Sequence, residues 1–449
     1  MYAPHTEKDI RAMLEVIGAS SLEALSSPPG GLAIKEGLNI APALPEAEAY
    51  AHIKALANQN TAARMVSFLG AGAYRHYQPP AVPWFATRSE FLTAYTPYQA
   101  EASQGSLQAI FEWQTYISLL TGMDVSNASL YDGATALVEG VIMSLHANGR
   151  KRVLISKAVH PMYRAVLATY AEGMGLEVVE LPVTTKGLTD TSRVDAKGAA
   201  CVVLQSPNFF GCIEDISTAA TVAHEAGALC VSVTAEALSL ALLKTPREAG
   251  ADIALGEGQS FGLPLGYGGP YVGFIATTKE HVRRLPGRLV GETTDVDGRR
   301  AFVLTLQGRE QHIRRELATS NICTNQALCA LIATVYLATV GSKGLQSIAA
   351  ANLQRARELQ EAVCAVPGFV AAYQSPYFNE FCVRTPVPAA QLVKRLEKRG
   401  ILAGLPLSRF YPELTHLVLM CATELTTSED IKALTEALVE ETARAVAAV

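Results

Sequence analysis

The chain has 449 residues, of which 49% are hydrophobic and 18% are charged, and this balance excludes an intrinsically disordered protein. Its formal net charge is −5 at pH 7, so nothing at the level of the whole chain points to nucleic-acid binding. The length is sufficient for a large α/β core and a smaller second domain.

The composition also bears on compartment and assembly. A mean hydropathy of +0.18 fits an obligate oligomer with large apolar interfaces, although alanine-rich helices alone would produce it. The eight cysteines form no C-x-x-C pair and no His/Cys spacing typical of a metal site, which favours reduced thiols and no bound metal. The first residues lack the layout of a signal peptide, and the longest apolar stretch, residues 327–340, is too short for a transmembrane helix. We therefore expect a cytoplasmic protein that binds neither nucleic acid nor a membrane.

Residues 1–60 are predicted to form an N-terminal helical arm. Thr6 begins an amphipathic helix that ends at Gly18, and a Pro/Gly cluster at 26–31 separates it from a second helix over 45–58. We expect such an arm to pack on the C-terminal domain or on a partner.

Residues 61–330 are predicted to form a large α/β domain in which short apolar strands alternate with helices. The predicted strands are residues 153–155, 201–204, 229–233 and 253–255, and the predicted helices are residues 108–120, 134–146, 161–174 and 216–226. This alternation implies a mostly parallel sheet covered by helices.

Residues 331–449 are predicted to form a smaller α+β C-terminal domain. A change from polar to apolar residues near 319–330 opens a long helix. Further helices are expected at 353–363, 390–399 and 428–446, and strands at 381–383 and 417–420. The length and element order resemble those of transferases that depend on pyridoxal 5'-phosphate (PLP), with the aspartate-aminotransferase-like fold type I.

Positive charge gathers in residues 279–315. This run holds nine basic and five acidic residues; the basic ones are Lys279, Arg283, Arg284, Arg288, Arg299, Arg300, Arg309, Arg314 and Arg315. Two interpretations stay open at this point, a solvated surface or a rim that attracts an anionic cofactor or an acidic partner.

Several motifs carry a resemblance to one family. They read FLGAGAY at 68–74, TPYQAEASQG at 96–105, NASLYDGATA at 127–136, GLPLGYGGP at 262–270 and ATSNICT at 318–324. Together these motifs resemble the N-terminal half of the P-protein of the glycine cleavage system, the PLP-dependent glycine decarboxylase. The resemblance is dense over residues 60–330 and looser in the arm and the C-terminal domain.

The resemblance also shows what this chain lacks. In the family, the lysine that holds the cofactor follows a strand in a His-Lys-Thr-Phe motif, and here Gln259 stands at that position. Glutamine cannot form a Schiff base. Family members with a live site carry an aspartate on the strand that faces the pyridine nitrogen, whereas Glu236 comes only past the strand end. We therefore expect the chain to bind no PLP covalently.

Two remnants of such a site are visible. Asp132 opens a helix where the phosphate would bind, although an ordinary helix cap explains it better. His160 stands about where a ring would stack on the cofactor, and we expect only a structural role for it.

The resemblance implies help to a partner's site. Thr319, Ser320 and Asn321 resemble a stretch that reaches the PLP phosphate of the neighbouring subunit, with Arg314 and Arg315 one turn earlier. Alternatively, Ser320 or Asn321 caps a helix that begins at Cys323. Leu317 departs from the lysine expected beside this motif, which removes a charge.

A second contribution is expected from the loop that carries Tyr95, Tyr98, Gln99 and Glu101. The hydrogen-bonding groups at the ends of these side chains are suitable for the wall of a substrate entrance, although an ordinary interface loop would look similar.

These features predict subunit 1 of a two-subunit glycine dehydrogenase (aminomethyl-transferring). By resemblance, the partner subunit carries PLP, the assembly is an α2β2 heterotetramer, and glycine and the lipoyl arm of H-protein are the substrates. The rival interpretation is a structural or regulatory pseudoenzyme subunit that contributes no site residue. A third, a self-sufficient PLP enzyme using Lys244 or Lys279, is disfavoured because neither lysine follows the right strand.

Overall fold

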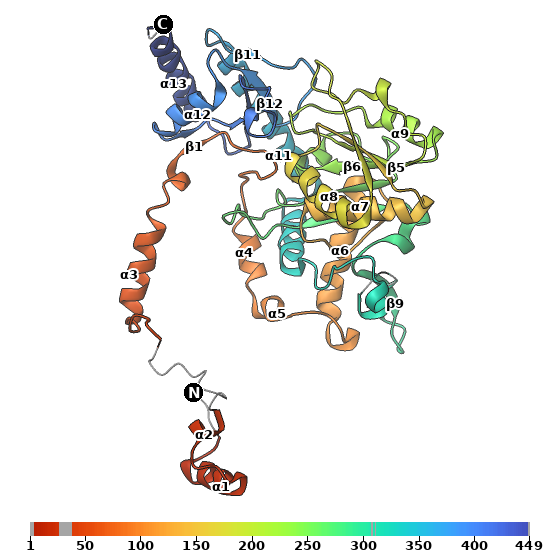
Figure 1. Cartoon of the computed structure of the whole chain (residues 1–449), viewed down its shortest axis with the longest axis vertical. Helices are drawn as coiled ribbons and strands as arrows, with labels where there is room; N and C mark the ends of the chain where they lie inside the picture. The colour runs from red at the N-terminus through yellow and green to blue at the C-terminus, as the bar shows by residue number, and fades with distance from the viewer. Residues whose placement is uncertain (1–3, 27–37, 307–308, 310, 448–449) are drawn as a thin grey trace. The chain divides into compact units, whose positions relative to one another are not determined.

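The structure is a computed structural model that describes residues 4–26, 38–306, 309 and 311–447. The chain divides into two compact units, Met1–Ala63 and Arg64–Val449 (Figure 1).

The described part of the first unit is mainly helical, and the domain boundary predicted at residue 60 stays a prediction. Its helices are α1 (Glu7–Ile17), α2 (Leu22–Ser26) and α3 (Glu46–Ala57). Thr6 and Asp9 form a reciprocal capping box at the start of α1, and Gly18 ends the helix in the left-handed conformation.

A sheet of seven strands forms the centre of the second unit. Its order is β2 (Val125–Ser126), β8 (Gly273–Thr277), β7 (Ile253–Glu257), β6 (Leu229–Thr234), β5 (Ala199–Gln205), β3 (Arg152–Ser156) and β4 (Glu177–Leu181). The five strands from β7 to β4 are parallel, whereas β8 and β2 are antiparallel to their neighbours. The predicted fold class, an α/β sheet that is mostly parallel, is confirmed.

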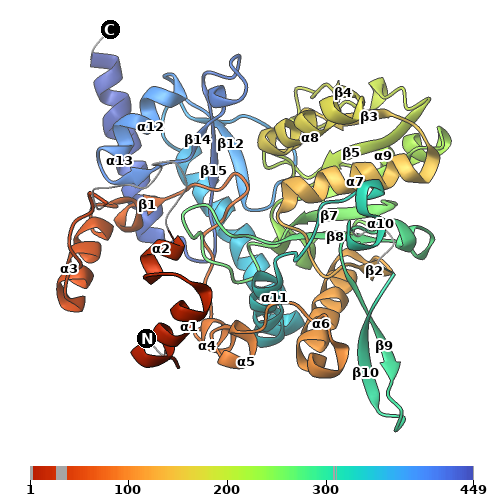
Figure 2. The ribbon, with the colours of Figure 1, turned by 60° about the horizontal axis from the view of Figure 1, so that its bottom comes forward.

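Helices cover both faces of this sheet (Figure 2), because its central strands are buried along their length and successive side chains point to opposite faces. On one face, Leu154 packs with residues of α6 (Gln104–Thr121), α9 (Ile216–Glu225) and the start of α11 (Ala327–Cys364). On the other face, its neighbours Val153 and Ile155 pack with α7 (Gly133–Asn148) and α8 (Pro161–Met174). The predicted helices and strands of this region are thus present, with ends that differ by a few residues.

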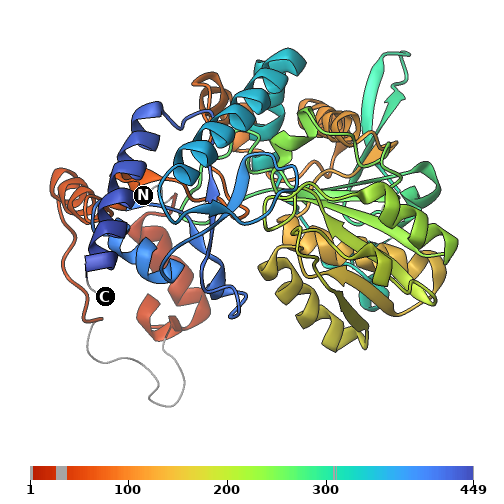
Figure 3. The ribbon, with the colours of Figure 1, turned by 90° about the horizontal axis from the view of Figure 1, so that it is seen from above.

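A smaller antiparallel sheet lies beside the first, towards the C-terminus (Figure 3). Its order is β11 (Val370–Ala371), β12 (Glu380–Arg384), β15 (Leu417–Cys421) and β14 (Leu405–Pro406), and it packs with α12 (Ala389–Glu397) and α13 (Ser428–Ala447). Strand β1 (Val66–Ser67) pairs with β13 (Ile401–Leu402), so the start of the unit is tied to this part.

Helix α11 runs from the large sheet to the small one. It contacts α6 and α4 (Ala81–Ala86) in the first part and α13 and β12 in the second. The predicted helix at 353–363 is therefore the second half of α11, whose regular geometry is interrupted at Gly341. The predicted boundary at 330 falls inside this helix and stays a prediction.

Two further features concern membranes and redox state. Among the described residues α11 is the one helix long and apolar enough to cross a bilayer by length and composition, and it is partly buried in the core, where Ala333 and Tyr336 are fully buried. All eight cysteines are free.

The basic run 279–315 does not form a plain helix and loop surface. It begins with a 3-10 helix, η6 (Lys279–Arg284), and continues as a hairpin of β9 (Leu289–Thr294) and β10 (Arg300–Thr305), which projects from the body in Figure 2. Helix α10 (Gln311–Arg314) and a 3-10 turn, η7 (Arg315–Leu317), follow.

Candidate functional site

Gln259, at the position expected for a cofactor lysine, follows strand β7 and is 1% exposed. Its amide oxygen accepts a hydrogen bond from the backbone N–H of Tyr74 at 2.9 Å. Its amide nitrogen donates to the carbonyl oxygens of Tyr74 and Leu263, at 3.0 and 2.8 Å. The side chain is therefore a buried structural amide that holds residues 74 and 263 in place.

Glu257, the last residue of β7, places its carboxyl group at the amino end of α7. Its carboxylate accepts backbone N–H groups from Gly133 at 3.0 Å, Val272 at 3.0 Å and Gln259 at 3.2 Å. Burial raises the pKa of Glu257 to about 8, against the lowering effect of these three amides. Gly133 begins α7, so an acidic side chain of the chain itself occupies the helix terminus where a phosphate would bind.

The other two residues that resemble parts of a PLP site, Asp132 and His160, also make hydrogen bonds within the chain. Asp132 caps α7 by accepting the Thr135 N–H at 2.7 Å, which supports the plain helix-cap interpretation. His160 caps α8, and its Nε2 atom lies 2.8 Å from the Ala71 carbonyl oxygen. Its ring lies 4.8 Å from that of Tyr163, and a Cβ atom at Gly133 would clash with the Tyr163 hydroxyl.

Glu236 is likewise engaged. Its carboxylate accepts the Leu238 N–H at 3.0 Å and the Asn379 amide at 3.2 Å. The described residues at this place therefore do not fit PLP: there is no lysine, the helix terminus is taken by Glu257, and Glu236 and His160 are committed to other contacts.

This packing leads to a first prediction, for the Gln259→Lys variant. We expect no stoichiometric pyridoxyl-lysine at residue 259 after incubation with PLP and reduction with borohydride, because Glu257 still occupies the phosphate position. Peptide mass spectrometry measures this, with the native chain as the control for surface lysines. Full labelling of residue 259 would contradict the prediction.

The predicted phosphate-contacting stretch is fixed to α7 by a buried ion pair. Arg309 and Glu139 are 6% and 5% exposed, and an Nη2–Oε2 distance of 2.5 Å joins them. Arg309 also donates to the side chain and the carbonyl oxygen of Thr319, at 3.1 and 3.2 Å. Ser320 donates its hydroxyl to Glu139 at 2.7 Å. We call these four residues, Glu139, Arg309, Thr319 and Ser320, the loop clamp.

The three residues predicted to contact the phosphate, Thr319, Ser320 and Asn321, differ in their exposure. Ser320 is buried and points to Glu139, whereas Thr319 and Asn321 on either side of it are exposed. The alternative of a helix cap at Ser320 or Asn321 is wrong, because α11 begins only at Ala327. Asn325, two residues before α11, has a φ of 50°, in the left-handed region.

Arg314 and Arg315 lie at the end of α10 and in η7, and both are exposed. Leu317, at the end of η7, is 70% exposed, so an apolar side chain stands at the surface beside the predicted site.

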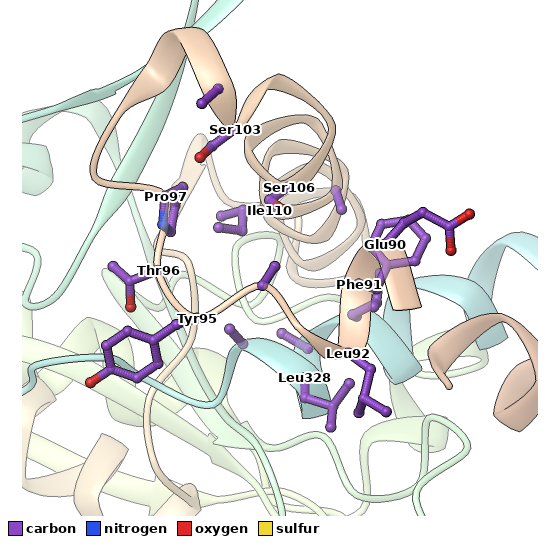
Figure 4. A pocket seen from close by; sticks show the side chains of 16 residues that line it. Glu90, Phe91, Leu92, Tyr95, Thr96, Pro97, Ser103, Ser106, Ile110 and Leu328 are labelled. Atoms are coloured by element: carbon purple, nitrogen blue, oxygen red, sulfur yellow. The ribbon is translucent and has the colours of Figure 1, made fainter. Parts of the chain in front are cut away.

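The predicted tyrosine loop is exposed as well. Tyr95 and Tyr98 are 75% and 66% exposed, and Gln99 and Glu101 are also at the surface. Behind the loop lies a pocket of about 350 Å³ between α5 (Ser89–Leu92), the first turns of α6 and the start of α11. In Figure 4, Thr96 and Pro97 form one wall of this pocket and Phe91 and Leu92 the other. The Thr96 hydroxyl is buried without a hydrogen-bond partner among the described residues.

One short segment, residues 284–288, connects the loop clamp to the tyrosine loop. The carbonyl oxygen of Arg284 accepts a hydrogen bond from Arg309 at 2.9 Å. The Arg288 guanidinium lies 5.6 Å from the centre of the Tyr98 ring. The structure therefore brings the two predicted groups, far apart in sequence, to the same connecting segment.

Sequence reasoning did not single out three contributors, namely Glu139, Arg309 and Arg288. Glu139 gave a signal, since it is a lone acid among the apolar residues of a predicted buried helix. The two arginines stood in the basic run without anything that set them apart. Among the described residues no group of three His, Cys, Asp or Glu side chains could hold a metal ion.

The chain is similar to known proteins over nearly its whole length. The sequence profile of the "Glycine cleavage system P-protein" family matches residues 1–438. The "Probable glycine dehydrogenase (decarboxylating) subunit 1" of Moorella thermoacetica is 50% identical, over 97% of this chain and 98% of that protein. The protein of the same name from Thermomicrobium roseum is 48% identical, over 99% of this chain and 100% of that protein.

Solved structures agree with this. A chain of a crystal structure of "glycine decarboxylase (P-protein) of the glycine cleavage system, in inhibitor-bound form" is 48% identical with a TM-score of 0.91, covering 98% of this chain and 99% of that chain. The glutamate decarboxylase of Lactobacillus brevis is 14% identical with a TM-score of 0.66, covering 90% of this chain and 95% of that chain, and this likeness concerns the fold alone.

Proposed function

The chain belongs to the glycine cleavage system P-protein family, and we propose that it acts as subunit 1 of a two-subunit glycine dehydrogenase (decarboxylating). With a PLP-bearing partner subunit it would decarboxylate glycine and transfer the aminomethyl group to the lipoyl arm of H-protein. We further propose an α2β2 heterotetramer in the cytoplasm, with no PLP held covalently by this chain. The observation that carries the proposal is the near-complete match to relatives named subunit 1, in a chain whose own cofactor position is filled by Gln259 and Glu257.

The cofactor of the partner supplies an electron sink for the carbanion that remains when CO2 leaves. The part of this chain would be to hold and enclose the partner's site. Thr319 already accepts a hydrogen bond from Arg309, so its hydroxyl proton is available to donate to a phosphate oxygen. Asn321 offers an exposed amide beside it.

Ser320 is a weaker candidate than the sequence suggested. Its hydroxyl would reach a phosphate only after leaving Glu139, whereas from its present position it holds the backbone between Thr319 and Asn321. We propose that Tyr95, Tyr98, Gln99 and Glu101 form the polar wall of the substrate entrance, with Arg314 and Arg315 on the same surface, because all six side chains are exposed.

The rival function is a scaffold subunit that contributes no residue to the chemistry. The internal bonds of Ser320 and Arg309 favour it, since both side chains are satisfied within the chain. A self-sufficient PLP enzyme has less support, because Lys244 and Lys279 do not follow β7.

A second prediction separates the two functions. In the reconstituted pair of subunits, the Thr319→Ala/Ser320→Ala variant is expected to retain PLP at least tenfold more weakly. The reason is that hydrogen bonds to a charged phosphate contribute about 1.5–3 kcal/mol each. PLP retention is measured by equilibrium dialysis, and assembly by sedimentation velocity.

The two single variants show which of the two hydroxyl groups causes the loss of PLP retention. We expect Thr319→Ala to account for most of it, while Thr339→Ala on α11, an exposed threonine bonded to its own helix, changes nothing. Intact assembly with unchanged PLP retention in the double variant would favour the scaffold function.

A further inference from the structure

Arg288 is a buried cation without an anionic partner. It is 4% exposed and directly precedes β9. Within the described part of the chain no carboxylate pairs with its guanidinium and no oxygen accepts a hydrogen bond from it. Its Cζ atom lies 5.6 Å from the centre of the Tyr98 ring.

Arg309 provides an internal comparison. It belongs to the same basic run and is buried to the same degree, at 6% exposure. Its guanidinium is nevertheless fully engaged, by the Glu139 carboxylate, by Thr319 and by the carbonyl oxygen of Arg284. This is the normal condition of a buried arginine, because a charge removed from water is strongly destabilising unless it is paired and hydrogen-bonded.

A cation–π contact does not replace such a partner, since it leaves all five N–H donors of the guanidinium unused. None of the Arg288 nitrogen atoms belongs to the fully inaccessible polar atoms without a partner among the described residues, so these nitrogen atoms keep some accessible surface. Tyr98, 66% exposed, lies over it. The N–H donors of Arg288 are therefore available to an anion that approaches beside Tyr98.

We propose that Arg288 is an anion-binding residue, and that its ligand is the phosphate group of the cofactor that the partner subunit presents. This inference rests on the proposed function and adds a residue to it. The segment 284–288 supports it, because this segment also anchors the loop clamp that positions Thr319 and Asn321.

The other small oxyanion of the reaction is the carboxylate of glycine, which an arginine fork binds equally well. The glycine carboxylate leaves as neutral CO2, so its negative charge decreases as the reaction approaches the transition state. A guanidinium bound to it would therefore stabilise the ground state and slow the reaction. A phosphate keeps nearly two negative charges throughout, so it is the ligand that chemistry favours at Arg288.

The test compares Arg288→Met, which removes the positive charge, with Arg288→Lys, which keeps the charge but cannot donate the two parallel hydrogen bonds of a guanidinium. In the reconstituted pair we expect PLP retention to fall at least tenfold for Arg288→Met and by less for Arg288→Lys, with the KM for glycine changed by less than threefold. Arg300→Met is the matched control, because Arg300 also lies over aromatic rings but pairs with Glu292 at 2.8 Å. It should change PLP retention by less than twofold.

The isolated chain gives a readout that needs no partner. We expect inorganic phosphate to raise the Tm of the native chain by about 1–2 °C over chloride at equal ionic strength, and to leave that of Arg288→Met unchanged. Without phosphate, Arg288→Met should be at least as stable as the native chain, because it removes an unpaired buried charge.

Three results would overturn the inference. PLP retention within twofold of native in Arg288→Met would show that Arg288 does not bind the cofactor phosphate. A raised KM for glycine at unchanged PLP retention would show that Arg288 binds the glycine carboxylate instead. Marked destabilisation by Arg288→Met in the isolated chain would mean that the guanidinium has an internal partner. If phosphate stabilises the native chain through Arg288 while neither Arg288→Met nor Thr319→Ala affects PLP retention, Arg288 binds an anion other than the partner's cofactor, and the scaffold function replaces the proposed contribution to the partner's site.

Discussion

Replacing Glu139 with alanine should lower the free energy of unfolding by about 3–5 kcal/mol, because the change leaves the buried Arg309 guanidinium without its anion. Ser320 loses its acceptor in the same variant, which adds an unsatisfied buried hydroxyl. Urea denaturation followed by circular dichroism measures the change. An exposed ion pair is the control: Glu292, paired with Arg300 at 2.8 Å, should contribute less than about 1 kcal/mol.

The Glu139→Leu/Arg309→Met variant separates the stability of the fold from the positioning of Thr319. A buried ion pair can often be replaced by apolar side chains of similar volume without loss of stability, so this variant should regain most of what Glu139→Ala loses. Thr319 would still lack the Arg309 contacts that hold it. We therefore expect PLP retention in the reconstituted pair to stay low. A loss of less than 1 kcal/mol in Glu139→Ala would show that the loop clamp does not stabilise the fold.

The sequence predicted the fold where local pattern decides it. Strands β3, β5, β6 and β7 are short apolar runs between helices, and both faces of the sheet are covered, so composition and spacing were enough. The hairpin β9–β10 was missed because its strands are polar and partly exposed, which leaves little apolar alternation to detect. The predicted helix start at Cys323 lies four residues before α11, because an apolar run does not reveal the left-handed backbone at Asn325.

The candidate site was predictable only in part, for a related reason. A missing lysine can be read from a motif, so Gln259 was identified directly. The bond from Gly133 to Glu257 joins residues 124 positions apart and follows from the tertiary fold alone. Arg309 and Arg288 show the same limit. They occupy one charged run, and only the structure distinguishes the paired guanidinium from the unpaired one.

The last prediction concerns a buried charge network that joins the two sheets of the second unit. His76 lies between two carboxylates, with its Nε2 atom 3.1 Å from Glu236 and its Nδ1 atom 2.8 Å from Glu424. Glu236 follows β6 of the large sheet, and Glu424 follows β15 of the small one. Asn352 of α11 donates to Glu424 at 2.9 Å. A protonated imidazole donates to both carboxylates at once, so the network is complete only when His76 is charged.

Burial alone would lower the pKa of His76, but Glu236 and Glu424 outweigh it and raise the pKa to about 9. A folded-state pKa above the unfolded value of about 6.5 contributes stability that is fully present below pH 6.5 and is lost as the pH rises through 9. For Glu424, burial acts to raise the pKa, and the bond from His76 outweighs it and lowers the pKa. Its contribution is therefore lost only in acid.

We expect the native chain to lose about 3 kcal/mol of unfolding free energy between pH 6.5 and pH 10 through His76. In His76→Gln this slope should disappear, and the variant should be about 3–5 kcal/mol less stable than native at pH 6.5, because two carboxylates remain buried without a cation. Urea denaturation at four pH values measures both effects. His224→Gln is the matched control, since His224 pairs with Asp252 at 2.8 Å but its side chain is 47% exposed, and it should change stability by less than about 1 kcal/mol. An unchanged slope in His76→Gln would mean that other groups carry the alkaline sensitivity and that His76 is neutral in the folded chain.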